Sequence, residues 1–323
     1  MQSGTSVTNP HVTIAVCSRN RPHQLQRWVA QMTALVDQHP TPLLIIEQSA
    51  QATPLPPHPL LTHIHAPGRG LSRARNRVLQ AATSAFVAFC DDDCVPSASW
   101  VTALYAALAA YPDAAVITGS TWPYAHHYTL YAHHTHAGYT AWATRADGMC
   151  CTALQVSATG TDVTHPVAIL EQLGQGNHMV VARQIALNHG GFHPWLGAGA
   201  WLHAGEDVEF MLRLLGRHQR CCYQPAMRLY HDAWQPAHLL AHAEHGYTTG
   251  MLAVHVWYAL YGDATAQAYL RFRWQQLWHT ATTPTTPAHP PRGRRWWWQR
   301  AWAWGLGILG GLVLALRAAW SQR

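Results

Sequence analysis

The sequence predicts an α/β fold with a doubly wound, mainly parallel β-sheet, and two observations support this prediction. Short β-branched and apolar runs, typical of buried strands, recur in the first part of the chain at 11–17, 43–47, 61–66, 85–90 and 114–119. Helical patterns separate most of these runs, so strands recur roughly every 25–30 residues, as parallel strands joined by crossover helices do.

The helices of the first half are predicted from their start signals and apolar faces. Pro22 suits the first turn of a helix that continues to about Val36. A second helix begins at residue 71 and has one apolar face, formed by Leu71, Ala74, Val78 and Leu79. A third helix is expected within 97–111, starting at a serine cap.

The second half shows the same alternation less regularly. The expected elements are a strand at 176–183, a short helix at 184–189 capped by Gly190–Gly191, a mobile glycine-rich loop at 191–205, a helix at 205–219, a strand at 220–231 and helices over 236–280. A histidine run precedes them, at His126, His127, His133, His134 and His136. Because these histidines lack regular ligand spacing, a metal site is not the favoured interpretation.

The C-terminal tail differs in composition from the rest. A proline- and arginine-rich linker leads into a tryptophan-rich apolar segment whose uninterrupted part, Ala301–Leu316, has 16 residues. A spanning helix needs about 20. Since arginines and tryptophans flank the segment, we expect a helix that associates with the membrane and is inserted shallowly rather than across it.

Charge and cysteine content limit the class of protein. All 21 basic residues are arginines, and six of them lie in the tail, which has no acid, so the other 15 balance the 15 acids of the body. Nucleic acid is therefore not an expected partner. Seven cysteines without a C-x-x-C pair, and a start unlike a signal peptide, predict free thiols in a reducing cytoplasm.

The acids of the chain follow predicted strands. The loop after the first strand, Glu47 and Asp91–Asp93 all stand at strand ends, which in such sheets line one cleft. In an extended segment Asp91 and Asp93 point the same way, and two carboxylates on one side suit Mg²⁺ or Mn²⁺. The alternative is a solvated turn that caps the next helix. Cys90 and Cys94 are interpreted as packing residues.

Seven segments in order resemble the family 2 glycosyltransferases, whose fold is called GT-A: VTIAVCSRNRP, LLIIEQS, GRGLSRARNRVL, AFVAFCDDDCVP, GQGNHMVVAR, GGFHPWLGAG and GEDVEFMLRL. The resemblance covers about 12–231 and continues weakly to about 278. It implies a Rossmann-like sheet flanked by helices, with C-terminal helices added. The implied domains are a catalytic domain over 1–235 (donor half about 11–120, acceptor half about 121–235), a helical extension over 236–280, a linker over 281–295 and a membrane-associated helix over 296–323.

The resemblance also assigns roles to residues. Donor-binding residues would be Cys17, Ser18, Arg19, Arg21, Glu47, Arg69, Arg73, Asn76, Asp91 and Asp92. Asp91, Asp93 and His231 would hold the metal, and Gly176, Asn177, Trp195, Gly197, Gly199 and Trp201 would form the acceptor side and lid. Glu206–Asp207 match the family's acid pair, with Asp207 as the base. At the start of a helix, Asp207 is kept ionised by the helix dipole.

These roles predict an inverting, metal-dependent glycosyltransferase. The donor would be a UDP-, GDP- or dTDP-sugar with Mn²⁺ or Mg²⁺ as cofactor, and the acceptor a glycan or lipid-linked hydroxyl, as in envelope polysaccharide or glycolipid biosynthesis. The expected location is the cytoplasmic face of the membrane, held peripherally or by a C-terminal anchor. Two alternatives remain: a nucleotidyltransferase, and a non-catalytic glycan-binding or membrane-scaffolding protein.

Overall fold

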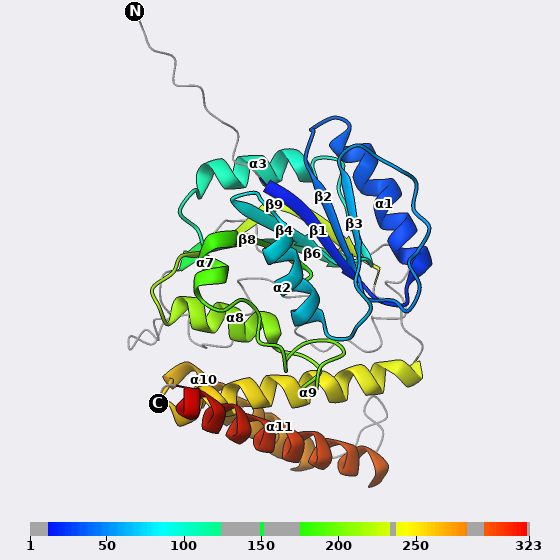
Figure 1. Ribbon diagram of the computed structural model, residues 1–323. Helices are drawn as coiled ribbons and strands as arrows, with labels where there is room; N and C mark the ends of the chain where they lie inside the picture. Colours follow the sequence, from blue (N-terminus) through cyan, green and yellow to red (C-terminus); the bar gives the residue numbers. More distant parts are fainter. Residues whose placement is uncertain (1–11, 124–148, 152–174, 233–236, 283–293, 322–323) are drawn as a thin grey trace, which may run out of the picture.

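A nine-stranded sheet forms the centre of the protein in the computed structural model, which describes residues 12–123, 149–151, 175–232, 237–282 and 294–321. The strands are β1 (Val12–Ser18), β2 (Leu43–Glu47), β3 (Leu61–His65), β4 (Phe86–Cys90), β5 (Cys94–Pro96), β6 (Val116–Pro123), β7 (Met149–Cys151), β8 (His178–Ala182) and β9 (Cys221–His231). Their order is β3-β2-β1-β4-β8-β6-β9-β5, with β7 paired to β9 (Figure 1).

The predicted α/β class is confirmed, but the sheet is mixed. Strands β3, β2, β1 and β4 are parallel neighbours, as the alternating pattern predicts. Strand β8 lies between β4 and β6 and is antiparallel to both, and β5 and β7 are antiparallel to β9. The mainly parallel description therefore fits the first half better than the second, because a hydrophobic pattern marks a strand but not its direction.

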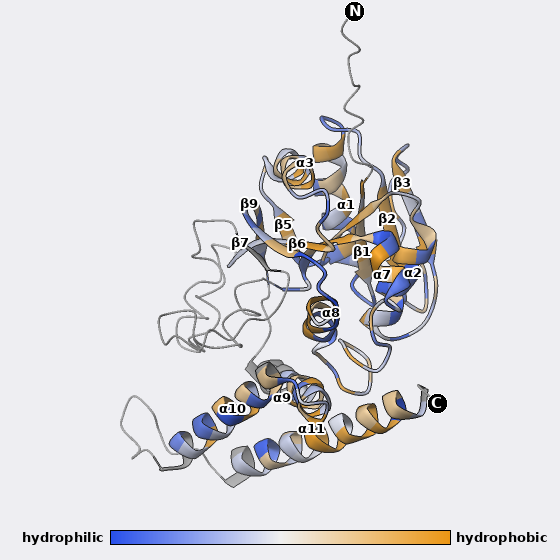
Figure 2. Ribbon diagram, turned by 90° about the vertical axis from the view of Figure 1, so that its left-hand side faces the viewer, coloured by the Kyte–Doolittle hydropathy of each residue, from blue (hydrophilic) through white to orange (hydrophobic). Residues whose placement is uncertain are grey.

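Helices cover both faces of the sheet, and three more form a separate layer (Figures 1 and 2). They are α1 (Pro22–Val36), α2 (Leu71–Ala81), α3 (Trp100–Ala110), α7 (Arg183–Asn188), α8 (Glu206–Leu215), α9 (Ala237–Leu260), α10 (Ala264–Thr282) and α11 (Arg294–Ser321). The expected serine cap of α3 is wrong in one respect: Ser99 occupies the cap position, but its side chain makes no capping hydrogen bond.

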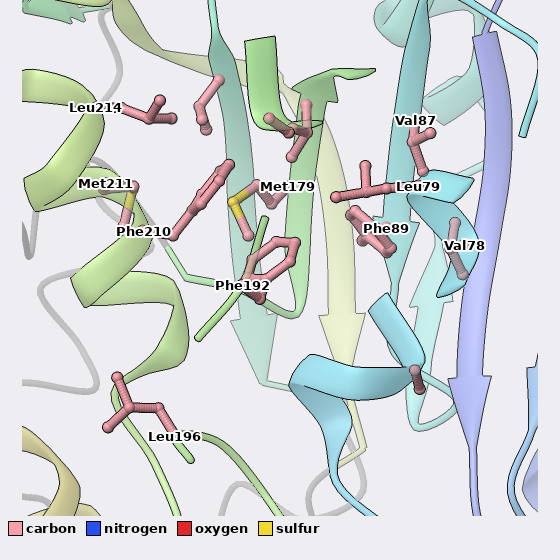
Figure 3. Close-up of a cluster of buried hydrophobic side chains, with 14 of the residues drawn as sticks. Val78, Leu79, Val87, Phe89, Met179, Phe192, Leu196, Phe210, Met211 and Leu214 are labelled. Carbon is pink, nitrogen blue, oxygen red and sulfur yellow. The ribbon is translucent and has the colours of Figure 1, made fainter. Parts of the chain in front are cut away.

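The sheet has a hydrophobic core on each side. Helices α1 and α3 bury Trp28 and Trp100 against one face. On the other face, α2, α8 and the loop before α8 pack around an aromatic group in which Phe192 stacks on Phe210 at 4.5 Å and meets Phe89 edge-on at 5.8 Å (Figure 3). This second core holds α8, which begins with the acid pair Glu206–Asp207, against the sheet.

One expectation about the cysteines is wrong. Cys222 is disulfide-bonded, whereas Cys17, Cys90, Cys94 and Cys221 are free thiols. The pairing of β7 with β9 sets Cys150 opposite Cys222 in the sheet, an alignment that the spacing of cysteines along the chain does not reveal.

The C-terminal helices lie beneath the α/β part, with α11 running alongside α9 (Figure 1). Glycines make this packing close: a Cβ on Gly307 would lie 2.7 Å from Leu252, and one on Gly311 would lie 2.6 Å from Val256. Helix α11 is also longer than the apolar run within it, and Trp297–Trp320 is long and apolar enough to cross a membrane. The histidine run and most of the predicted linker fall outside the described residues.

Candidate active site

The strand ends bring Ser18, Arg21 and the three aspartates together, as the sequence predicts. The expected extended course through Asp93 is wrong, because β4 ends at Cys90 and the aspartates form a turn in which the N–H of Cys94 donates to the carbonyl of Asp91 at 3.0 Å. Ser18 Oγ donates to Asp92 Oδ2 at 2.6 Å. Arg21, next to the start of α1, donates from Nη1 to Asp92 Oδ1 at 2.8 Å and to Asp93 Oδ2 at 2.9 Å. Asp92 is buried, and burial raises its pKa although Arg21 opposes the shift. Asp92 thus links β1 to the end of β4, and its contact with a donor stays a prediction.

Asp93 and His231 form one edge of the site because β5 pairs with β9, which places Cys94 opposite His231. His231 Nε2 lies 3.4 Å from Asp93 Oδ1. Ligand atoms of Asp93, Cys94 and His231 all lie within 4.8 Å of one another. The pKa of the Cys94 thiol is raised by its hydrogen bond with Cys90 and by burial, which keeps it a thiol and a poor ligand.

Burial and neighbouring charges shift the pKa values of Asp91 and Asp93 in opposite directions. Burial raises the pKa of Asp91 to about 6, the charges of Asp93 and Asp92 add to the rise, and Arg75 opposes it. For Asp93, burial is outweighed by the hydrogen bond and charge of His231 and by Arg21, which lower the pKa. Asp93 and His231 together offer carboxylate oxygens and an imidazole nitrogen, a donor set that Mn²⁺ accepts and that Mg²⁺ accepts in part, whereas Asp91, the third predicted ligand, lies outside this group of described residues.

The acid pair Glu206–Asp207 begins helix α8. Asp207 Oδ2 accepts from the backbone N–H of Gly176 at 2.8 Å, and its Oδ1 accepts from the N–H of Val208 at 2.8 Å. Glu206 is buried, and burial together with the charge of Asp207 raises its pKa to about 7. Asp207 is half-buried. Of the two acids it is the one open to an incoming hydroxyl.

Sequence reasoning did not select Arg75, which contacts both groups of acids. Its side chain is 1% exposed. Nη1 donates to Glu206 Oε1 at 2.9 Å, and Nη2 donates to the carbonyl of Gly176 at 2.7 Å and to Asp91 Oδ1 at 3.4 Å. A signal exists in the sequence: position 75 follows Leu71 by four residues, so this arginine belongs to the apolar face of α2.

Tyr247 of α9 is a second residue that the sequence did not indicate. Its ring is 60% exposed, yet loss of solvation and the charges of Glu206, Asp207, Asp91 and Asp93 raise the pKa of its hydroxyl. The helix is held here by its glycines: a Cβ on Gly250 would lie 2.3 Å from the carbonyl oxygen of Ala204. The charges of these acids therefore reach α9, the first of the C-terminal helices.

Two predicted donor residues are engaged by the protein itself. Glu47 is buried; its oxygens accept from the N–H and hydroxyl of Thr53 at 2.9 and 2.6 Å, and His63 Nε2 lies 2.9 Å away. Asn76 exchanges two 2.7 Å hydrogen bonds with the backbone of Phe192. Glu47 thus orders the loop after β2 and Asn76 fixes the loop before α8, and their contact with a nucleotide stays a prediction.

The other predicted donor residues are more open. Arg69 and Arg73 are exposed near the start of α2, and Arg19 is exposed and donates to the carbonyl of Gly68 at 2.9 Å. Cys17 is half-buried, and burial raises the pKa of its thiol to about 12. The three arginines supply positive charge where a diphosphate is expected.

The predicted lid loop contacts both α2 and the acids. A Cβ on Gly197 would lie 3.0 Å from Glu206 Oε2, and one on Gly199 would lie 3.3 Å from Arg69. Both glycines have positive φ, 94° and 77°, which other residues adopt at a cost. The backbone N–H of Leu71 donates to the carbonyl of Ala198 at 2.9 Å. The loop therefore lies between the acid pair and the start of α2.

The remaining acceptor-side residues lie in two places. Buried Asn177 accepts from the backbone N–H of Asp91 through its carbonyl at 3.2 Å, next to the aspartates. Trp195 and Trp201 instead contact each other edge-on, and the guanidinium of Arg317 lies 4.2 Å from the centre of the Trp195 ring. The two tryptophans therefore connect the lid loop to α11 rather than to the acids.

Part of the chain matches a known protein family. Residues 13–157 match the model of the glycosyl transferase family 2, and the predicted resemblance to this family is confirmed. The prediction that the chain is a glycosyltransferase enzyme is confirmed with it. Among curated proteins, none matches the chain in sequence.

Many solved structures are similar to the chain, among them the following two. Mannosyltransferase PcManGT from Pyrobaculum calidifontis, in complex with GDP-Man and Mn²⁺, is 15% identical with a TM-score of 0.53, and the match covers 96% of this chain and 88% of that one. GalNAc-T7 with UDP, GalNAc and Mn²⁺ is 13% identical with a TM-score of 0.49, and the match covers 80% of this chain and 50% of that one. The likeness to the mannosyltransferase confirms the predicted GT-A type of fold.

Proposed function

We propose that the protein is a metal-dependent, inverting glycosyltransferase that moves a sugar from a nucleoside diphosphate sugar to a hydroxyl. The observation that carries the proposal is the buried guanidinium of Arg75, which contacts both Asp91 at the end of β4 and Glu206 at the start of α8. A donor-side acid group and an acceptor-side acid pair are thereby held on two sides of one site.

The residues divide the reaction between them. Asp91, Asp93 and His231 would hold the cation, which when bound neutralises charge on the diphosphate leaving group. Arg69, Arg73 and Arg19 are exposed, and their positive charges would also attract the negatively charged diphosphate. Asp207 accepts the proton of the acceptor hydroxyl as it attacks, since such a hydroxyl does not ionise at neutral pH. One nucleophile and one leaving group on opposite sides give a single displacement and hence inversion.

The site favours this function over the two alternatives. A nucleotidyltransferase would need a phosphate-binding loop after the first strand, but there Ser18 and Arg21 are bonded to the aspartates. A non-catalytic scaffold would not need an oriented carboxylate, yet Asp207 is held by two backbone N–H groups and remains accessible to an acceptor hydroxyl.

The donor is tested by thermal unfolding with UDP-, GDP- and dTDP-sugars, each with and without Mn²⁺. A ligand at about 100 times its Kd stabilises the folded state by about 2.7 kcal/mol. We therefore expect one nucleotide class to raise Tm by roughly 5 °C in the presence of Mn²⁺ and much less without it. The Asp93→Asn variant should lose most of this metal-dependent shift. Equal shifts with and without Mn²⁺ would rule out the metal assignment.

We also propose that α11 lies in the membrane interface, so that the acceptor is membrane-proximal, such as a lipid-linked glycan or envelope polysaccharide precursor on the cytoplasmic face. One side of α11 packs on α9 and buries Ala303 and Leu314. The other side exposes a stripe of large apolar residues: Trp298, Trp302, Leu309, Leu312 and Leu316. Packing along α9 favours a helix in the plane of the interface over one that leaves the protein to span the bilayer.

Binding to vesicles tests the stripe. Replacing Trp302 and Leu309 by glutamine removes two large apolar side chains, each worth about 1.5–3 kcal/mol when buried, so vesicle binding should weaken at least tenfold. Sedimentation with vesicles of phosphatidylcholine and phosphatidylglycerol measures the change. The control is Ala109→Gln with Ala110→Gln on exposed positions of α3, across the sheet from α11. Unchanged binding by the stripe variant would exclude this surface.

A further inference from the structure

Arg75 is the buried charge around which the site is built. It lies on the apolar face of α2, and its guanidinium carbon is 5.8 Å from the centre of the Phe89 ring and 5.4 Å from that of Phe192. Burying a charge in such surroundings is costly unless the charge is paired and hydrogen-bonded. Cation–π contact offsets part of the cost, and the rest must come from polar partners.

The polar partners of Arg75 all belong to the proposed site. Directly, the guanidinium holds the carboxylates of Glu206 and Asp91 at 2.9 and 3.4 Å. Through the backbone of one residue it also reaches Asp207: the carbonyl of Gly176 accepts from Arg75 at 2.7 Å, and the N–H of Gly176 donates to Asp207 at 2.8 Å. One side chain is therefore connected to three acids from two distant parts of the sequence.

Space around these contacts is tight, so the arrangement has little freedom. A Cβ on Gly176 would lie 3.0 Å from Arg75 Nη1 and 2.8 Å from the Cβ of Asp207. The two shortest bonds of the guanidinium go to the acceptor side, whereas the contact with Asp91 is the longest. Loss of Arg75 should then disturb the acid pair more than the metal side.

We propose that Arg75 is a positioning residue, which sets the place of the acid pair relative to Asp91 by holding Glu206 directly and Asp207 through the backbone of Gly176. This inference rests on the proposed transferase function and adds a residue to it. Arg75 touches neither donor nor acceptor in this account; it acts through the acids. A lysine at this position has one point charge and cannot reproduce the two-sided contacts of a planar guanidinium.

A double-mutant cycle tests the proposal, with turnover of the nucleotide sugar that the wild type consumes with Mn²⁺. We expect Arg75→Lys to lower kcat about 100-fold and to change the donor KM by less than about threefold. In a Glu206→Gln background the same substitution should lower kcat only about tenfold, because the link to Glu206 is already lost. Equal losses in both backgrounds, or a lower Tm with unchanged kcat, would overturn the proposal.

Controls separate this outcome from unfolding and from failure of the transferase proposal. Arg77→Lys changes an exposed arginine of the same helix and should keep wild-type kcat. If Arg75→Lys does not fold, the double variant Arg75→Met with Glu206→Gln takes its place, because it removes both buried charges. The kcat of this double variant should be about tenfold lower than that of Glu206→Gln alone. An equal kcat overturns the proposal. A wild type that consumes no UDP-, GDP- or dTDP-sugar contradicts the transferase function and this inference together, whereas an active wild type matched by Arg75→Lys contradicts the inference alone.

Discussion

Replacing Asp207 by asparagine should abolish sugar transfer while leaving donor binding nearly intact. The substitution keeps the shape of the side chain but removes its ability to accept a proton, and general-base catalysis contributes about 10²–10⁴-fold to such reactions. The amide also fits its surroundings poorly, because both oxygens of Asp207 accept backbone N–H groups and an NH₂ group cannot. We therefore expect kcat to fall at least 10³-fold.

The measurement is kcat for transfer together with the Mn²⁺-dependent thermal shift caused by the nucleotide sugar. The shift should stay close to that of the wild type, since the metal-side residues are unchanged. Asp113→Asn is the matched control: this aspartate is 63% exposed and pairs with Arg220 at the surface, so its loss should leave kcat unaltered. Wild-type turnover by Asp207→Asn would show that another group takes the proton.

Replacing Gly176 by alanine should have the second-largest effect. The added methyl group would lie 2.8 Å from the Cβ of Asp207 and 3.0 Å from both Asp207 Oδ2 and Arg75 Nη1, so at least one of these side chains must move. A displacement of about 1 Å in an active site can cost about 100-fold in rate. We expect a loss of about that size in kcat.

The same assay applied to Gly305→Ala gives the control. This glycine lies in α11, and a Cβ there would meet nothing within 4 Å, so the alanine should be neutral or slightly stabilising. Thermal unfolding should show that Gly176→Ala still folds, with a modest cost of about 1–3 kcal/mol for the crowded methyl group. Full activity in Gly176→Ala would mean that Asp207 tolerates displacement and is not the base.

Local sequence patterns were sufficient for most elements of the fold. The predicted α1 has the observed bounds, Pro22–Val36, because proline at its start and a clear apolar face mark it. Strands β2 and β4 are buried along their whole length, and apart from Glu47 at the end of β2 they are continuous apolar runs. The position of the aspartates at a strand end, and hence beside Ser18 and Arg21, followed from the same patterns.

What the sequence could not supply depends on contacts between distant segments. The direction of β8, the disulfide at Cys222 and the pairing of β5 with β9 arise from strand alignment, which no local pattern carries. Side-chain partners are equally hidden. The loop before α8 supplies the hydrogen-bond partners of Asn76, and the acids that surround Arg75 come from the end of β4 and the start of α8.

The central claim is that a divalent metal at Asp91, Asp93 and His231 enables transfer from a nucleoside diphosphate sugar. The most direct measurement is the release of nucleoside diphosphate from UDP-, GDP- and dTDP-sugars, with Mn²⁺, with Mg²⁺ and with a chelator. The account predicts release from one nucleotide class only when metal is present, and its loss in Asp93→Asn. Release that continues undiminished in the chelator, or no release from any sugar nucleotide with either metal, would contradict it.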